Sequence, residues 1–245
     1  MYWYIWLGIG IIVVGLVIFL LQPLKIPREP FREGEQDREA STDYNKVSHW
    51  PVFALERYLI LHGLRKLKPC GLLVDVGCGP GYLTVSIGKN YRDMKIIGLD
   101  NNINMINIAS RNWPVETHNN IEFVEGNVQK LPFADGSIDC IVSSLSLHHW
   151  QDAGEACKEI NRVLKPGGQF LIFDLKRNSP RIFFYFLWLG QLMSPGAIKR
   201  TNGAIGSLWS SYTTRELQKI FLKESWQNLR IDGKLGWLIV SAVRS

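Results

Sequence analysis

The residues best suited to chemistry lie in the stretch LLVDVGCGPGYLTVSIG, residues 72–88. An apolar run ends in the acid Asp75, and three glycines follow at alternate positions, Gly77, Gly79 and Gly81. Residues without a side chain let a ligand lie flat against the main chain, and they also accept positive φ angles in a tight turn. We therefore expect a small-molecule binding turn between a strand and a helix.

A second acid makes the nature of this ligand more specific. Dinucleotide-binding proteins place the pattern G-x-G-x-x-G at such a turn, but this chain has Tyr82 where the third glycine would stand. Asp100 ends the run KIIGLD about 20 residues beyond the glycines, the position from which a carboxylate accepts hydrogen bonds from ribose hydroxyls. The alternative role for Asp100 is to cap the helix that follows it. Together the two features favour a ligand that contains a nucleoside.

Alternating strand and helix patterns must position these residues. Short apolar runs at 72–76, 95–100, 121–126, 138–144 and 167–175 alternate with segments of helical spacing. Such alternation is typical of parallel strands joined by right-handed crossover helices. The last two runs, WQNLRID and GWLIVSAVR, are separated by a very short connection and predict an antiparallel hairpin. The predicted fold class is α/β, with a doubly wound, mostly parallel seven-stranded sheet and an antiparallel C-terminal hairpin.

Four motifs along this alternation resemble those of the class I S-adenosylmethionine-dependent methyltransferases. They are VDVGCGPG, GLDNN, GNVQKLPFADGSIDCIVSS and EINRVLKPGGQFLIFD, in the order in which that family has them. The resemblance covers about 47–245 and is most specific between 74 and 168. It implies a Rossmann-like methyltransferase fold, S-adenosyl-L-methionine as cofactor, and the subgroup of enzymes that acts on small molecules and lipid-like acceptors.

The resemblance also implies how the cofactor is held. The three glycines would pass under its methionine and ribose portion, and Asp75 would orient the methionine end. Asp100 would bind the ribose hydroxyls, with Asn101 beside the adenine. Asn127 stands where the family usually has aspartate, so its carbonyl oxygen would accept from the adenine amino group without a negative charge. Val128 would cover the ring.

Candidates for catalysis follow the fourth and fifth strands. A general base is needed only when the methyl acceptor is a poorly ionised hydroxyl, thiol or carbon acid. His148 and His149 lie at the ligand-binding end of the sheet, where a histidine can take a proton at neutral pH, although packing is the alternative role for both. Tyr212 is a second candidate, for positioning the acceptor, and Asp174 is a third. The family's Asn/Asp-Pro-Pro-aromatic motif for amino acceptors is absent, so methylation of DNA bases is not expected.

The N-terminal run MYWYIWLGIGIIVVGLVIFLL has no charged side chain and is long enough to span a bilayer as a helix. A cleaved signal peptide would have a basic n-region and a small-residue cleavage site, and this run has neither. Lys25, Arg28, Arg32 and Arg38 follow the run and no basic residue precedes it. The pattern predicts a single-pass transmembrane helix with the catalytic domain in the cytoplasm.

Composition limits the remaining possibilities. The chain has 245 residues and a net charge of +6, but no Lys/Arg cluster dense enough to favour nucleic acid as a partner. Its four cysteines form no CxxC pair and no metal-ligand spacing, so we expect reduced thiols and no metal. The expected domains are a transmembrane anchor at 1–22, a polar linker at 23–46 and a methyltransferase domain at 47–245.

The function predicted from these features is that of a membrane-anchored methyltransferase. The apolar run 182–189 lies in the region between the fifth strand and the last helix where the acceptor would bind. With the anchor, it favours an apolar or lipid-like small-molecule acceptor. The alternatives are a methyltransferase that acts on a soluble metabolite or protein, and a protein that binds S-adenosylmethionine without turnover. The methylated atom and the oligomeric state stay open.

Overall fold

The computed structural model describes residues 3–30, 38–114, 116–200 and 203–245. Within this part of the chain, seven strands form one sheet in the order β3-β2-β1-β4-β5-β7-β6. The strands are β1 (Leu72–Val76), β2 (Lys95–Asp100), β3 (Ile121–Glu125), β4 (Ile138–Ser144), β5 (Leu164–Leu175), β6 (Trp226–Gly233) and β7 (Trp237–Arg244). Strands β1 to β5 are parallel, and β7 pairs antiparallel with both β5 and β6. The predicted fold class, including the antiparallel end of the sheet, is confirmed.

Helices cover both faces of this sheet because successive strand residues point to opposite faces. Leu73 packs in a cluster with α3 (Pro51–Leu67) and α4 (Tyr82–Asn90). Its neighbour Val74 packs with α6 (Ala153–Val163) and α10 (Thr214–Phe221). Helix α5 (Ile103–Asn112) contacts β2 and β3. The core is therefore two apolar layers, one on each side of the sheet.

The helix starts are determined by local capping. The Asn102 side chain accepts from the Asn104 N–H at the start of α5, and Asp152 accepts from Gly154 at the start of α6. At α10, Thr213 and Glu216 form a reciprocal capping box. These caps fix where α5, α6 and α10 begin.

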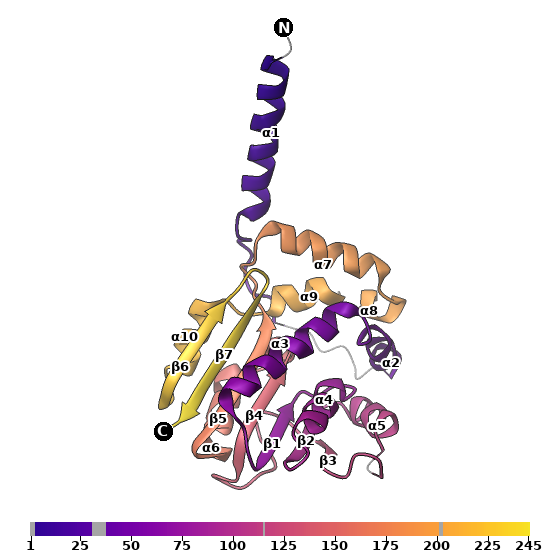
Figure 1. The fold of residues 1–245 in the computed structure, drawn as a ribbon, viewed down its shortest axis with the longest axis vertical. Coiled ribbons are helices and arrows are strands. Elements are labelled where there is room, and N and C mark those ends of the chain that lie inside the picture. Colours follow the sequence, from indigo (N-terminus) through magenta and orange to yellow (C-terminus); the bar gives the residue numbers. More distant parts are fainter. Residues whose placement is uncertain (1–2, 31–37, 115, 201–202) are drawn as a thin grey trace.

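A layer of helices lies beyond the carboxyl ends of the parallel strands (Figure 1). Its members are α2 (Arg38–Val47), α7 (Arg181–Met193), α8 (Gly196–Arg200) and α9 (Gly203–Ser210), and a 3₁₀ turn, η1 (Leu147–His149), lies beneath them. Helix α1 (Trp3–Leu21) stands away from the rest of the molecule and meets it near the start of α7 (Figure 1).

The predicted transmembrane anchor over 1–22 is not confirmed. Among the residues that the structure describes with their side chains, no helix is both long enough and apolar enough to cross a membrane.

The segment predicted as a polar linker, 23–46, makes specific contacts with the domain. The Leu24 N–H donates to the Ser179 carbonyl (2.9 Å), and the Glu29 N–H donates to the Trp209 carbonyl (3.1 Å). Helix α2 occupies its second half and contacts α5 and α8. Residues 31–37, with the predicted basic flank residue Arg32, lie outside the described residues. The domain boundaries themselves stay predictions.

Candidate active site

The glycine turn joins β1 to α4 at the carboxyl end of the sheet. The N–H groups of Gly77 and Cys78 donate to the Leu99 carbonyl on β2, at 2.7 and 3.0 Å. Gly77 and Gly81 both have positive φ angles, 72° and 85°. A Cβ atom on Gly77 would lie 2.3 Å from the Ser146 hydroxyl, and one on Gly81 would lie 2.7 Å from the Phe123 ring. Only glycine fits these two positions, which explains the spacing seen in the sequence.

Asp100 holds the glycine turn in place. Its Oδ2 accepts from the Gly79 N–H at 2.9 Å, and its Oδ1 accepts from the Asn102 N–H at 2.9 Å. The carboxylate therefore links the turn after β1 to the start of α5 after β2. Its position at the end of β2 agrees with the predicted ribose role, and the two hydrogen bonds add a structural one.

Asp75 lies beneath the turn and is 1% exposed. Its Oδ2 accepts from the Thr84 hydroxyl at 2.6 Å, whereas its Oδ1 has no hydrogen-bond partner among the residues described. Burial, together with the nearby charge of Asp100, raises the pKa of Asp75 to about 7. A buried carboxyl oxygen without a partner is costly, so the site is suited to a ligand that supplies a donor or a positive charge.

The predicted adenine-side residues lie at the ends of β2 and β3. Asn101 is exposed directly after β2. Asn127 is also exposed, and its Oδ1 accepts from the Gln129 N–H at 2.8 Å within a turn. Val128 is buried and packs in the core cluster that includes Val76 and Leu99. The strand pairing of Asp100 with Glu125 brings all three residues to the same edge of the sheet.

His148 and Asp174 form a buried pair at the ends of β4 and β5. The imidazole Nδ1 lies 2.7 Å from Asp174 Oδ1, and the His148 backbone N–H donates to Oδ2 at 2.9 Å. A carboxylate only accepts hydrogen bonds, so it favours the tautomer with the proton on Nδ1 and leaves Nε2 as the basic nitrogen. This arrangement is suited to a general base whose orientation is fixed by an acid.

The other two predicted catalytic residues are placed differently. The His149 ring packs on His148 with 4.1 Å between ring centroids, and burial beside His148 holds the pKa of His149 well below its usual value. Tyr212 is buried between α9 and α10, where the Arg28 guanidinium lies 4.0 Å from its ring centroid. Burial raises the pKa of Tyr212. Tyr212 therefore stays a neutral phenol at physiological pH.

Sequence reasoning missed Glu56 on α3. This residue is 8% exposed, and its Oε1 accepts from the Ser144 hydroxyl at the end of β4. Burial raises the pKa of Glu56 to about 7. Glu56, Ile60 and Leu64 are the buried residues of α3 and repeat every four positions. An acid on the buried stripe of an amphipathic helix is the signal by which it could have been found.

Helix α2 covers the glycine turn and was also not expected. The Tyr44 ring approaches Gly79, with 3.7 Å between its Cε1 and the position of a Cβ on that glycine. Polar contacts help to hold the helix: Asn102 donates to Ser41 at 3.3 Å, and the Tyr82 hydroxyl donates to Asn45 at 3.1 Å. Tyr82, noted in the sequence as the departure from a dinucleotide fingerprint, thus helps to hold α2 over the site.

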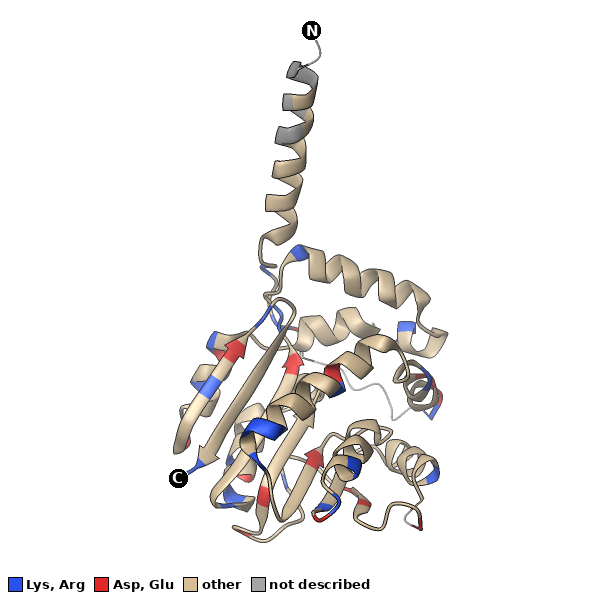
Figure 2. Ribbon diagram, viewed as in Figure 1, with Lys and Arg blue, Asp and Glu red and all other residues tan. Residues whose placement is uncertain are grey.

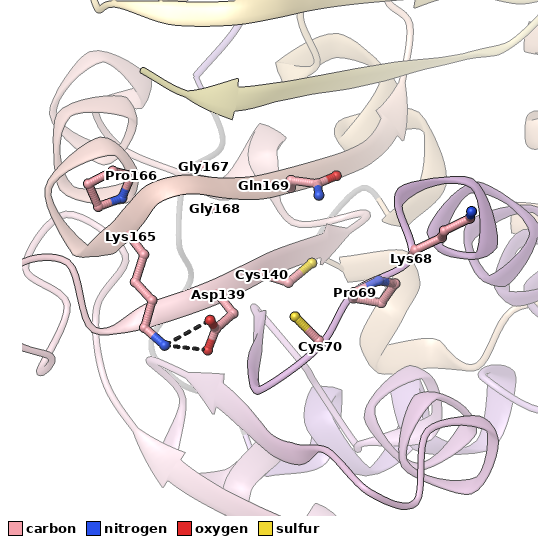
Figure 3. Close-up of a pocket in the computed structure, with 10 residues that line it drawn as sticks. All are labelled: Lys68, Pro69, Cys70, Asp139, Cys140, Lys165, Pro166, Gly167, Gly168 and Gln169. Carbon is pink, nitrogen blue, oxygen red and sulfur yellow. Dashed lines mark hydrogen bonds and ion pairs between the residues drawn. The ribbon is translucent and has the colours of Figure 1, made fainter.

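A shallow pocket at the opposite edge of the sheet is not part of this site. Figure 3 shows Lys165 and Asp139 in it, paired at 2.7 and 2.8 Å beside Cys70. It lies at the amino ends of the parallel strands, whereas ligands of doubly wound sheets bind at the carboxyl ends. Within the described part of the chain, no three His, Cys, Asp or Glu side chains are grouped to hold a metal ion.

Comparisons with known proteins point to one family. Residues 74–172 match the family described as "Methyltransferase domain". The chain is 33% identical over 144 residues to the demethylmenaquinone methyltransferase of Lactococcus lactis, a match that covers 55% of this chain and 54% of that protein. It is also 33% identical over 132 residues to malonyl-[acyl-carrier protein] O-methyltransferase 1 of Coxiella burnetii, covering 54% and 43%. The chain spans about half the length of the curated relatives it matches.

Solved structures share the fold at low sequence identity. A SAM-dependent methyltransferase of Aquifex aeolicus superposes with a TM-score of 0.61 at 18% identity, over 85% of this chain and 99% of that one. Phosphoethanolamine N-methyltransferase 2 of Haemonchus contortus, solved with S-adenosyl-L-methionine, gives 0.64 at 14% identity, over 85% and 57%.

Proposed function

We propose that this chain, whose central part is a methyltransferase-family domain, transfers a methyl group from S-adenosyl-L-methionine to an apolar or lipid-like small molecule at a membrane surface. The observation that carries the proposal is the gathering of Asp75, the glycine turn and Asp100 at one edge of the sheet, inside the segment that matches the family. A soluble acceptor and a binding protein without turnover are the alternatives that the experiments below separate.

The residues present fit the cofactor. The unpartnered Asp75 oxygen offers an acceptor to a positively charged group, and the side-chain-free turn leaves room for a ligand against the main chain. Asp100 is the last residue of β2, the strand next to β1, which is the position of a ribose-binding acid in doubly wound folds. Bound S-adenosylmethionine supplies an electrophilic methyl group on a positively charged sulfur.

The chain's own contribution to the reaction is to place and, where needed, deprotonate the acceptor. His148 would take the acceptor proton on Nε2, while Asp174 holds Nδ1 and stabilises the imidazolium that results. The helices that lie beyond the strand ends (Figure 1) would cover the acceptor and limit its contact with water. Tyr212 lies at the border of this layer and is a candidate to position the acceptor.

Helix α7 supports an apolar acceptor and a membrane surface. It has no buried residue, and after Arg181 its sequence, IFFYFLWLGQLM, is uncharged (Figure 2). Its large exposed apolar residues gather on one side of the helix: Ile182, Tyr185, Phe186, Trp188, Leu189, Leu192 and Met193. A stable protein rarely leaves so continuous an apolar face in water.

The surroundings of α7 favour lipid as the partner of this face. The end of α1 is joined to the start of α7 by a backbone bridge between Pro23 and Pro180, and the described side chains of α1 are apolar and exposed. Exposed Lys25 lies near this junction, and Lys199 follows the far end of α7. An apolar helix face with basic residues at its ends is typical of an interfacial helix on anionic lipid.

Label transfer tests the activity. The purified protein with radiolabelled S-adenosylmethionine is expected to label the organic-solvent fraction of a cell extract, and mass analysis then identifies the product. Label in the aqueous or protein fraction would instead indicate the soluble acceptor. Binding of the cofactor by calorimetry, with label in no fraction, would contradict methyl transfer.

A fluorescent label tests the lipid-facing surface. In a Cys70→Ser background, NBD attached at Leu189→Cys is expected to shift to shorter wavelength when the full chain is moved from detergent into anionic nanodiscs, because the α7 face enters an apolar medium. NBD at Leu222→Cys, an equally exposed leucine just after α10, is the matched control and is expected to stay unshifted. Equal spectra at both positions would rule out α7 as the membrane contact.

A further inference from the structure

Two buried carboxyl groups from different elements lie on the same face of the sheet at this site. Asp75 belongs to β1 and Glu56 to α3, on the face of the sheet that α3 and α4 cover. The Thr84 hydroxyl donates to one oxygen of Asp75, and the Ser144 hydroxyl donates to one oxygen of Glu56. The remaining Asp75 oxygen, Oδ1, is buried without a partner among the residues described. This oxygen points to a missing donor.

The electrostatics of the ligand-free pair are unfavourable. The pKa of each acid is raised to about 7, mainly by burial, and the charge of Asp75 is a minor cause of the rise at Glu56. Arg57, whose guanidinium also donates to the Ser48 carbonyl, lowers the pKa of Glu56, but the effect of burial is larger. The other titratable groups near the pair are Tyr44, Cys78 and Asp100. Asp174 also acts on Tyr44. All four are neutral or acidic, so none of them compensates two buried negative charges.

We propose that Glu56 and Asp75 together bind the positively charged end of the cofactor, and that binding expels a proton from the pair. The proposal rests on the proposed function, because it takes S-adenosylmethionine as the ligand. Two neighbouring buried carboxylates do not both ionise in the absence of a cation. When the ligand's ammonium group enters, the carboxylic O–H bond breaks, the proton passes to solvent, and the ligand keeps its charge.

Calorimetry measures this proton. The full chain is titrated with S-adenosylhomocysteine and with S-adenosylmethionine between pH 5.5 and 7.5, in buffers of different ionisation enthalpy. The ligand's α-amino group, with an ordinary pKa of about 7.7–8.0, stays mainly protonated in this range. We expect release of about one proton per ligand near pH 6, and a dissociation constant that falls about tenfold per pH unit below pH 7. Equal behaviour of the two ligands would assign the effect to the ammonium group, and a larger effect with S-adenosylmethionine would assign part of it to the sulfonium.

The variant Glu56→Gln keeps an oxygen that accepts from Ser144 but cannot ionise. It is expected to release markedly less proton than the parent, to flatten the pH dependence, and to bind both ligands at least about tenfold more weakly at pH 7.5. Glu56→Asp, which retains a carboxyl group, is expected to restore part of the proton release. Glu155→Gln, an exposed acid on α6 paired only with Lys158, is the matched control and is expected to behave like the parent.

Thermal stability without ligand gives an independent readout. An acid whose pKa is raised in the folded state binds a proton more tightly folded than unfolded, so its contribution to stability falls as pH rises from its usual 4.5 to about 7. The Glu56→Gln side chain cannot ionise, so this variant does not lose stability at residue 56 as the pH rises. The Tm of Glu56→Gln, relative to the parent, is therefore expected to be higher at pH 7.5 than at pH 5.

The outcomes separate this inference from the proposed function. Tight binding that is independent of pH and releases no proton, or equal proton release by the parent and Glu56→Gln, would overturn the inference and leave the methyltransferase proposal intact. Failure of the folded parent to bind either ligand at any pH would overturn the proposed function itself.

Discussion

A His148→Gln variant is expected to bind S-adenosylhomocysteine with parental affinity but to transfer the methyl group at least about a hundredfold more slowly, if the acceptor must lose a proton. Glutamine keeps a polar group near Asp174, and the backbone N–H that donates to this carboxylate is unchanged. What is lost is a ring nitrogen that can accept a proton. The turnover number with the acceptor identified by label transfer, and the dissociation constant from calorimetry, measure the two effects separately.

Two further variants make this expectation specific. Asp174→Asn removes the charge that stabilises a protonated His148 and is expected to slow transfer by a smaller factor. His149→Gln replaces a ring whose pKa lies well below its usual value, and it is expected to retain most of the activity. A parental rate in His148→Gln would show that the acceptor reacts without help from this base. Loss of cofactor affinity in the same variant would mean that His148 supports the binding site rather than the reaction.

The Asp100→Ala variant is expected to weaken cofactor binding by about a hundredfold or more, while the protein stays folded. The carboxylate accepts two backbone hydrogen bonds, from Gly79 and Asn102, and each such bond to a charged acceptor contributes about 1.5–3 kcal/mol. Without it, the glycine turn loses its link to the start of α5, and the ligand loses its ribose partner. A moderate fall in Tm is expected as well.

The matched control for Asp100 lies at the other end of the same strand. Asp93 is exposed just before β2, so Asp93→Ala is expected to leave both the dissociation constant and the Tm close to the parental values. Circular dichroism establishes that each variant is folded before calorimetry is interpreted. Parental affinity in a folded Asp100→Ala protein would remove the ribose assignment.

Local signals were enough to predict the sheet and its ligand-binding edge. The periodicity of apolar residues separates strands from helices, and crossover handedness then leaves few topologies. The glycines were readable because a positive φ and a close neighbour exclude any side chain at Gly77 and Gly81.

Hydrogen bonds between residues far apart in the sequence could not be predicted in this way. Arg28 donates to the Ser210 carbonyl at 2.7 Å, and Asn102 donates to Ser41, across separations of 182 and 61 residues. These contacts use ordinary polar side chains and backbone carbonyls, which have no pattern that marks them in advance. A polar segment at 23–46 therefore predicted a linker, whereas the structure packs parts of it against the domain.

For this protein, the sequence alone determined the fold class and the position of the glycine turn and Asp100, because apolar periodicity, the spacing of the glycines and an acid at the end of an apolar run are each visible within a short stretch of sequence. The tertiary structure decided which other groups join them. It paired His148 with Asp174, 26 residues apart, and brought Glu56 from α3 to the Ser144 hydroxyl at the end of β4. Burial then raised the pKa values of Glu56 and Asp75, and burial is a property of the packed molecule rather than of any short stretch of chain.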